Sequence, residues 1–206
     1  VGEVIRDAVL RGCRHFIVGI GGSATNDGGI GMLQALGAEF LDKSGKQVPF
    51  GALGVEKLAA INCENMLPEL KDCNFRIACD VDNPLCGENG CSHIFGPQKG
   101  ATPELVEQMD VWMERYAELS RFYSCDPDYP GSGAAGGLGF AFLSYTDAVL
   151  ESGVKIVLEE TKLEQYIKNA DIVITGEGRL DGQTVMGKAP IGVAGMAKKY
   201  GKRVLA

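Results

Sequence analysis

Five glycine-rich loops constrain the fold and function of this chain more than any other feature of its sequence. Glycine takes positive φ angles at no steric cost and exposes backbone N–H groups, so such loops let the main chain approach an anion closely. Most of the loops also carry an acidic residue, and enzymes that handle phosphates use carboxylates for magnesium binding and proton transfer. We number them loops 1 to 5, at residues 19–29, 80–87, 95–100, 131–137 and 175–182.

The totals define the class of protein. The 206 residues suffice for one large domain or one and a half typical ones. The 29 glycines are about double the usual share of about 7%, but they lie in motifs between apolar runs, so disorder does not explain them. A net charge of −7 argues against a broad basic face for nucleic acid. We found no signal peptide and no apolar run near the ~20 residues of a membrane span, and we expect a cytoplasmic protein without membrane partners.

The seven cysteines indicate free thiols in a reducing compartment, because their number is odd and no Cys-x-x-Cys motif occurs. A zinc site of Cys86, Cys91 and His93 is the alternative, but that spacing fits no common pattern of zinc ligands.

Hydrophobic periodicity predicts an α/β fold. We expect a first helix that buries Val4, Ile5, Ala8 and Val9 and ends at Gly12. Thr102 and Pro103 predict the start of the longest helix. Thr161 and Glu164 have the spacing of a capping box and predict another helix start. Further helices are predicted at 30–36, 140–150 and 191–200, and strands at 15–20, 75–79, 154–158, 171–175 and from 202.

The end of the chain reads as strand, loop, helix and strand, which is a βαβ unit of a parallel sheet. Ligands of such sheets bind beyond the carboxyl ends of strands, where loop 5 lies. The sequence stops just inside a strand, so we expect polypeptide to be missing there.

Familiar nucleotide motifs match only in part. Gly19-x-Gly21-x-x-Ala24 follows a strand and resembles the dinucleotide fingerprint, whereas the similar string at 131–136 lacks a preceding strand. Residues 182–188 match a Walker A loop up to Lys188, but Ala189 stands where the magnesium-binding Ser or Thr belongs.

Any one of these loops, taken alone, is better explained as a tight turn that needs positive φ. Five loops with so many polar and acidic residues favour one shared site. Those residues are Ser23, Thr25, Asn26, Asp27, Asp80, Asp82, Glu177, Arg179 and Asp181.

Five blocks in order resemble the bacterial class I glycerate kinases. They are Gly-Ile-Gly-Gly-Ser-Ala-Thr-Asn-Asp-Gly-Gly at 19–29, Ala-Cys-Asp-Val-Asp-Asn-Pro-Leu at 78–85, Phe-Gly-Pro-Gln-Lys-Gly-Ala at 95–101, Gly-Ala-Ala-Gly-Gly-Leu-Gly at 133–139 and Val-Ile-Thr-Gly-Glu-Gly-Arg-Leu-Asp at 173–181. The resemblance implies ATP-dependent phosphorylation of D-glycerate to 2-phosphoglycerate, with the 3-phosphate as the alternative product. Phosphoryl transfer of this kind also calls for Mg²⁺ as a cofactor.

Members of that family are longer, so the resemblance implies that segments are missing at both ends and are needed for activity. It also implies two α/β parts. Residues 1–160 correspond to a central mixed α/β domain, and residues 161–206 to part of a Rossmann-like domain with a three-layer parallel sheet.

Residue chemistry assigns roles within this hypothesis. Gly21, Gly22, Ser23 and Thr25 are candidates to donate hydrogen bonds to phosphate oxygens, with Asn26 and Asp27 in the same nucleotide-binding group. Asp80 and Glu177 are candidate magnesium ligands, and Asp181 is the candidate general base. Arg179 suits the glycerate carboxylate. Lys188 or Lys99 could offset charge on the transferred group, and Lys99 is also a candidate to bind substrate.

Two other classes of function stay open. One is a nucleotide- or phosphate-binding module without catalysis, and the other is an NAD-dependent oxidoreductase that uses residues 19–24. The sequence does not decide the oligomeric state, for which a homodimer is one candidate.

Overall fold

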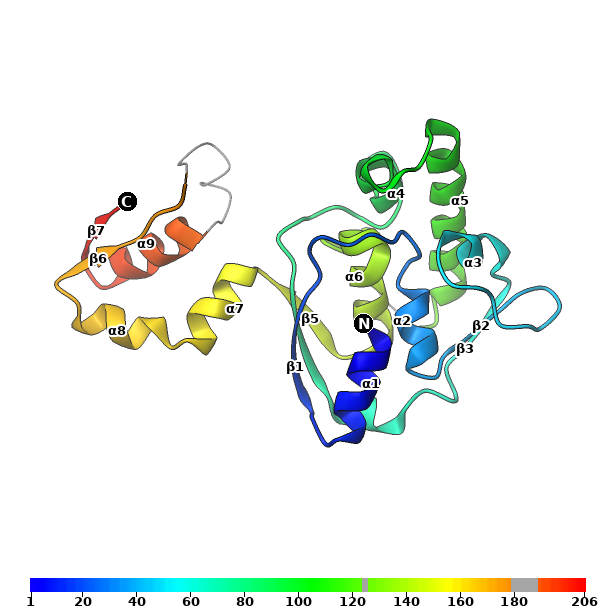
Figure 1. Ribbon diagram of the computed structural model, residues 1–206, viewed down its shortest axis with the longest axis horizontal. Coiled ribbons are helices and arrows are strands. Elements are labelled where there is room, and N and C mark those ends of the chain that lie inside the picture. The colour runs from blue at the N-terminus through cyan, green and yellow to red at the C-terminus, as the bar shows by residue number, and fades with distance from the viewer. Residues whose placement is uncertain (124–125, 179–188) are drawn as a thin grey trace. The chain divides into compact units, whose positions relative to one another are not determined.

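The computed structural model describes residues 1–123, 126–178 and 189–206 (Figure 1). The chain forms two compact units, Val1–Leu150 and Glu151–Ala206. The predicted mixed α/β fold is confirmed. The domain division expected near residue 160 stays a prediction about the domains of a longer protein.

The first unit is built on a sheet in the order β1-β4-β5 and carries a small antiparallel sheet of β2 and β3. Its elements are α1 (Gly2–Leu10), β1 (His15–Gly19), α2 (Ile30–Ala35), β2 (Glu39–Leu41), α3 (Ala52–Lys57), β3 (Ala60–Asn62), the 3₁₀ helix η1 (Pro68–Asp72), β4 (Asn74–Ala78), α4 (Cys91–Phe95), the 3₁₀ helix η2 (Pro97–Lys99), α5 (Pro103–Ser120), α6 (Ala134–Tyr145) and β5 (Ala148–Glu151).

The pairing of β1 with β4 decides where the loops go. The two strands are parallel, and Gly19 lies opposite Ala78 at their carboxyl ends. Loop 1 leaves directly after Gly19, and loop 2 begins two residues after Ala78. Both loops therefore start at the same edge of the sheet, which is where parallel sheets bind their ligands.

Aromatic side chains hold this sheet to the helices. Phe16 of β1 stacks on Phe75 of β4 with ring centroids 4.8 Å apart, and Phe142 of α6 packs 5.8 Å from Phe75. Phe75 and Phe142 are fully buried, and burying a side chain of this size stabilises the fold by about 1.5–3 kcal/mol. α6 is thereby fixed on the sheet next to loops 1 and 2.

The predicted start of α5 is confirmed. Thr102 Oγ1 accepts a hydrogen bond from the Leu105 amide at 3.3 Å, and Pro103 is the first helical residue. Met109, Met113 and Tyr116 form the buried stripe, and Trp112 packs against the same core. α5 is thus a core helix.

The second unit contains α7 (Gly153–Glu160), α8 (Leu163–Asn169), β6 (Ile172–Ile174), α9 (Ala189–Lys199) and β7 (Arg203–Leu205). β6 and β7 pair in parallel, which confirms the predicted βαβ unit. Ile167, Val173 and Ala197 form the core of this unit.

The structure corrects the prediction around residue 155. Residues 154–158 were expected to form a strand, but they lie in α7, with Ile156 and Leu158 buried and Val157 exposed. A short apolar run suits either a strand or a buried helix, so periodicity could not separate the two.

Thr161 is also not a helix N-cap. It is the C-cap of α7, and its hydroxyl donates to the carbonyl of Val157 at 2.7 Å. α8 begins after Lys162, which has a left-handed φ of 53°. A threonine hydroxyl bonds equally well to a carbonyl one turn back, and here the preceding helix supplies that carbonyl.

One boundary and one buried face also differ from the prediction. The helix expected at 140–150 runs from Ala134 to Tyr145, and β5 follows it. In α1, Val4 is 73% exposed, while Gly2, Ile5 and Val9 are buried. Gly2 faces the backbone of α2 so closely that a Cβ there would overlap the carbonyl oxygen of Met32. This close approach turns the buried face of α1 away from Val4.

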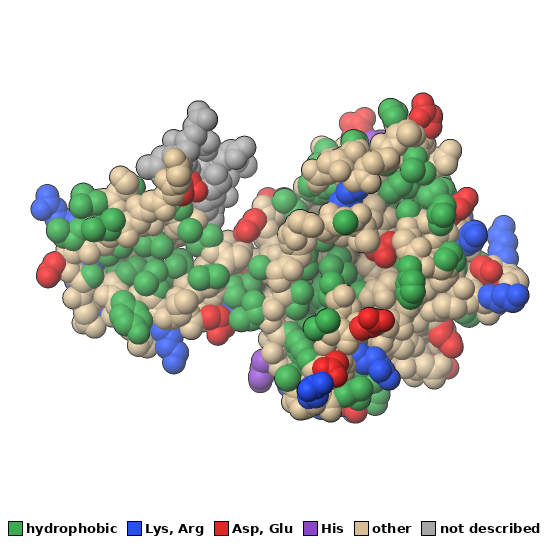
Figure 2. Space-filling model, viewed as in Figure 1, with side chains coloured by type: hydrophobic (Ala, Val, Ile, Leu, Met, Phe, Trp, Pro, Cys, Tyr) green, Lys and Arg blue, Asp and Glu red, His purple; other side chains and the backbone are tan. Residues whose placement is uncertain are grey.

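Charges are mixed on the visible surface. On the face shown in Figure 2, Lys and Arg side chains are scattered among Asp and Glu and form no broad basic patch. Within the described residues, none of the helices combines the length and the apolar character that crossing a membrane requires.

Candidate functional site

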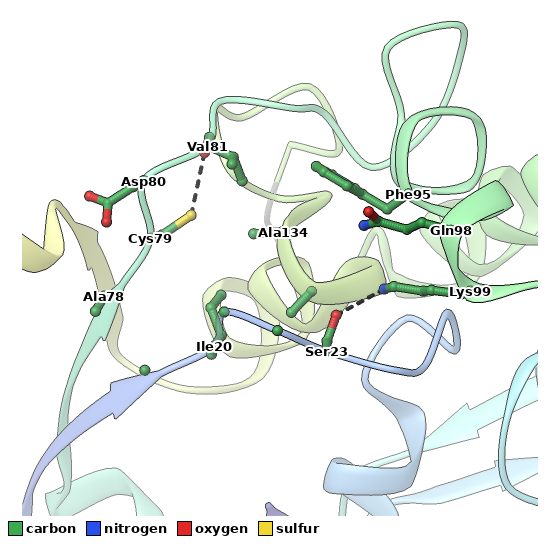
Figure 3. Close-up of a pocket in the computed structure, with 14 residues that line it drawn as sticks. Ile20, Ser23, Ala78, Cys79, Asp80, Val81, Phe95, Gln98, Lys99 and Ala134 are labelled. Atoms are coloured by element: carbon green, nitrogen blue, oxygen red, sulfur yellow. Dashed lines mark hydrogen bonds between the residues drawn. The ribbon is translucent and has the colours of Figure 1, made fainter. Parts of the chain in front are cut away.

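A pocket of about 370 Å³ lies at the carboxyl ends of β1 and β4 (Figure 3). Four glycine-rich blocks of the first unit reach it. Its lining comprises residues 19–23, residues 78–81, Phe95, Gln98, Lys99, Ala134 and Ala135. Segments more than 100 residues apart in the sequence thus share one cavity.

Loop 4 holds this arrangement together by packing main chain against main chain. The amide of Gly28 donates to the carbonyl of Gly136 at 2.8 Å. A Cβ on Gly136 would overlap the carbonyl oxygen of Thr25, and its φ of +69° is left-handed. On the other side, the amide of Gly133 donates to the carbonyl of Asn83 at 2.9 Å. Loop 4 therefore joins loops 1 and 2.

Lys99 reaches across the pocket to loop 1. Its Nζ donates to Ser23 Oγ at 2.8 Å and to the carbonyl of Thr25 at 2.6 Å (Figure 3). Burial lowers the pKa of Lys99, and the negative charge of Asp27 opposes that shift. An ammonium group has three donors, so one remains for an incoming anion.

The main chain of loop 1 faces the pocket at Gly21 and Gly22. Both residues are exposed, and no atom lies within 4 Å of the position a Cβ would take on either. An anion can therefore come close to this backbone, with the Lys99 ammonium beside it.

Of the six residues proposed to bind nucleotide, Gly21, Gly22 and Ser23 line this pocket. Thr25 and Asp27 instead line a separate cavity of about 720 Å³ beside α1 and Phe50. Loop 1 thus has two faces, of which only one carries the exposed glycine main chain.

Asn26 and Asp27 are the buried polar residues of loop 1 itself. Asn26 Nδ2 donates to Ser92 Oγ at 3.0 Å, and Asp27 Oδ1 accepts from the Gly29 amide at 3.1 Å. Burial raises the pKa of Asp27, and the hydrogen bond from Gly29 lowers it in part. These contacts hold the loop from beneath.

Asp80 is exposed at the rim of the pocket, with its carboxylate directed away from the pair formed by Lys99 and Ser23 (Figure 3). Across residues 1–123, 126–178 and 189–206, no three His, Cys, Asp or Glu side chains gather to hold a metal ion. A single carboxylate still suits Mg²⁺, which keeps several waters and takes its other ligands from phosphates.

Asp82 of loop 2 is exposed and does not line the pocket. The other predicted residues belong to loop 5 and to the segment between that loop and α9. Glu177 is exposed in the second unit. Arg179, Asp181 and Lys188 lie outside the described residues, so their roles stay predictions.

Among the described cysteines, Cys79 lines the pocket and the other five do not. The six cysteines within the described residues are free thiols. Burial raises the pKa of Cys91 to about 12, so this thiol stays protonated at neutral pH. His93 lies 3.7 Å from Asp110, which accepts from the Gly87 amide, and no metal-ligand group forms around it among the described residues.

Sequence reasoning missed Gln98 and Ser92. The sequence did carry a signal for Gln98, because this residue precedes Lys99 within loop 3. In the structure Gln98 lines the same pocket. Ser92 had no signal in the sequence, because its partner is 66 residues away.

Comparison with known proteins decides the family. The sequence matches the glycerate kinase family over residues 1–206. The chain belongs to the glycerate kinase family. It is 50% identical to the glycerate kinase of Haemophilus influenzae over 208 residues, which is 100% of this chain and 55% of that protein. It is 48% identical to the glycerate 2-kinase of Escherichia coli, covering 99% of this chain and 54% of that protein.

A solved structure agrees with the fold. The chain resembles a crystal structure described as glycerate kinase 2 from Salmonella typhimurium LT2, with a TM-score of 0.92 and 50% identity over 98% of this chain and 55% of that one. The chain therefore spans about half the length of these relatives.

Replacing Gly136 by Ala tests the packing of loop 4 on loop 1. We expect Gly136→Ala to lower the free energy of unfolding by more than about 3 kcal/mol, because the methyl group overlaps Thr25 as well as straining φ. Gly45→Ala is the matched control, since Gly45 also has positive φ but open space around it, and should cost about 1 kcal/mol. Equal losses in chemical denaturation would contradict the close packing.

Replacing Asp27 by Asn tests its burial. Because the folded-state pKa is raised, the contribution of Asp27 to stability is present below about pH 4 and is lost as pH rises through that pKa. Asp27→Asn should therefore gain stability relative to wild type as pH rises from about 4 to about 7. Denaturant unfolding at several pH values measures this difference.

Asp42→Asn is the control of opposite sign. The Ser44 hydroxyl and the Lys46 amide hold the pKa of Asp42 below its usual value, so the wild-type carboxylate stabilises the folded state above that range. This variant should lose stability relative to wild type as pH rises. Parallel pH profiles for the two variants would refute the assignment of Asp27.

Proposed function

We propose that the protein to which these residues belong transfers a phosphoryl group from ATP to D-glycerate and forms 2-phosphoglycerate. One observation carries the proposal: in a member of the glycerate kinase family, an exposed glycine main chain and the ammonium of Lys99 share one pocket at the carboxyl ends of parallel strands. Main-chain donors beside a fixed cation form a binding site for phosphate.

The nucleotide phosphates bind to loop 1 in this proposal. The amides of Gly21, Gly22 and Ser23 donate to phosphate oxygens, and the third donor of Lys99 meets the same group. Thr25 accepts from Lys99 through its carbonyl, while Asn26 and Asp27 hold the loop in shape from beneath. Lys99 then offsets negative charge as the phosphoryl group leaves ADP.

Magnesium, when bound with the nucleotide, neutralises charge on the phosphates. Asp80 is the proposed ligand in the first unit and Glu177 the proposed ligand in loop 5.

Loop 5 supplies the acceptor side of the proposed reaction. Asp181 takes the proton from the glycerate hydroxyl as its oxygen bonds to the γ-phosphorus and the bond to ADP breaks. Arg179 binds the glycerate carboxylate in a bidentate fashion, and Lys188 is the alternative to Lys99 for offsetting charge on the transferred group.

The proposed enzyme is longer than this chain and acts in the cytoplasm. Residues 1–160 form its central α/β domain, and residues 161–206 form part of a Rossmann-like domain whose remainder completes the site. The free thiols fit a reducing compartment. A homodimer is the proposed assembly.

Lys99→Met tests the phosphate site. The variant keeps the length of the side chain but loses the charge, so kcat/KM for ATP should fall by about 10²-fold in an assay of the whole protein with D-glycerate, ATP and Mg²⁺. Lys43→Met, in the exposed turn after β2, is the control and should change nothing. Equal activity of both variants would remove Lys99 from the mechanism.

Two further measurements identify the product and the nucleotide. Coupling through enolase detects 2-phosphoglycerate directly, and a requirement for added phosphoglycerate mutase would indicate the 3-phosphate. Protection from proteolysis by ATP, but not by NAD, separates the kinase from an oxidoreductase. Protection by ATP without turnover would indicate a binding module.

Asp181→Asn and Glu177→Gln test loop 5. Each removes a carboxylate with little change of shape, and kcat should fall by at least about 10²-fold for a general base. If both variants retain near wild-type turnover, the roles assigned to loop 5 are wrong.

A further inference from the structure

We infer that Ser92 is a positioning residue for the phosphate-binding face of loop 1, acting through Asn26. This inference rests on the proposed binding of nucleotide phosphates to loop 1. Ser92 lies in α4 and is 0% exposed, and its Oγ accepts from Asn26 Nδ2 at 3.0 Å. Neither side chain lines the pocket, so Ser92 acts on the site only through the loop.

Loop 1 needs such support because it has no regular structure between Gly19 and Ile30. Its exposed glycines have few conformational restraints of their own. Asn26 is 6% exposed, its backbone lies directly against Gly136, and its Oδ1 is buried with no hydrogen-bond partner. The bond from Nδ2 to Ser92 is therefore the hydrogen bond that orients this buried side chain.

Ser92 also fixes the place of Lys99. The amide of Gly96 donates to the carbonyl of Ser92 at 2.9 Å, and a Cβ on Gly96 would overlap that oxygen. The turn from α4 into η2 is therefore tight, and the amide of Lys99 in turn donates to the carbonyl of Gly96 at 2.9 Å. One short segment thus contacts loop 1 twice, at Asn26 through Ser92 and at Ser23 through Lys99.

Losing the Ser92 hydroxyl frees the Asn26 amide and lets loop 1 shift relative to Lys99. We expect this shift to weaken nucleotide binding while the acceptor side is unchanged. Ser92→Ala should raise KM for ATP by about 10-fold, short of the roughly 10²-fold that a misplacement of 1 Å can cause. The KM for glycerate should stay at its wild-type value.

Ser120→Ala is the matched control. Ser120 is also buried, at 1% exposed, and its Oγ donates to the carbonyl of Tyr116 at 2.8 Å. It does not line the pocket. Both variants lose one buried serine hydroxyl, so both should lower Tm. A rise in KM for ATP that appears in Ser92→Ala alone separates positioning from general destabilisation.

A double-mutant cycle tests the path through Asn26. If the bond between the two side chains carries the effect, adding Ser92→Ala to Asn26→Ala should raise KM for ATP no further. Where Ser92→Ala does not fold, Ser92→Cys serves instead, since it keeps a side chain of similar size but accepts hydrogen bonds weakly. The inference is overturned if the KM for ATP of the Ser92 variant rises no more than that of Ser120→Ala, or if the two changes are additive.

Calorimetric titration with ATP and Mg²⁺ separates this inference from the proposed function. A wild-type protein that binds ATP but does not phosphorylate glycerate refutes the function alone, and the Kd of the variants then replaces KM in the comparison. A wild-type protein that neither binds ATP nor turns over glycerate overturns both.

Discussion

The site depends on one constraint: loop 4 lies against loop 1 at a distance that only glycine permits. The carbonyl of Gly136 accepts a hydrogen bond from the Gly28 amide. Residue 136 lies so close to Thr25 that it has no room for a side chain of its own. The parallel pairing of β1 and β4 brings loops 1 and 2 to one edge, and loop 4 then fixes their relative positions. The glycines of this chain therefore serve two purposes, since some allow backbone packing and others, such as Gly21, expose backbone to the pocket.

The charges around loop 1 follow from this packing. Lys99 is half-buried and bonded to Ser23 and to a carbonyl, while Asp27 is buried on the other side of the same loop. Burial acts against both charges, lowering the pKa of the ammonium and raising that of the carboxyl group. Lys99 forms no ion pair with a carboxylate of the described residues, so an anion in the pocket would supply a negative partner, which favours phosphate over a neutral ligand.

Local signals made part of this structure predictable. The start of α5 follows from Thr102 and Pro103, and the parallel β6–β7 pair follows from its alternation with a helix. The prediction of a strand at residues 154–158 was wrong, because the hydrophobic periodicity of a five-residue apolar run does not distinguish a strand from a buried helix. The glycine-rich blocks indicated a shared pocket, but not which side of loop 1 faces it. That side is set by the bond of Asn26 to Ser92, a contact between distant segments that no local pattern encodes.

The most direct test of this account is to locate the nucleotide phosphates by amide chemical shifts. We expect titration of the ¹⁵N-labelled whole protein with ATP and Mg²⁺ to shift the amides of Gly21, Gly22 and Ser23 most strongly, with smaller changes at Lys99. Inorganic phosphate at higher concentration should shift the same amides. Shifts that leave these residues unchanged and cluster around the cavity beside Phe50 would contradict the claim that the exposed main chain of loop 1 binds phosphate.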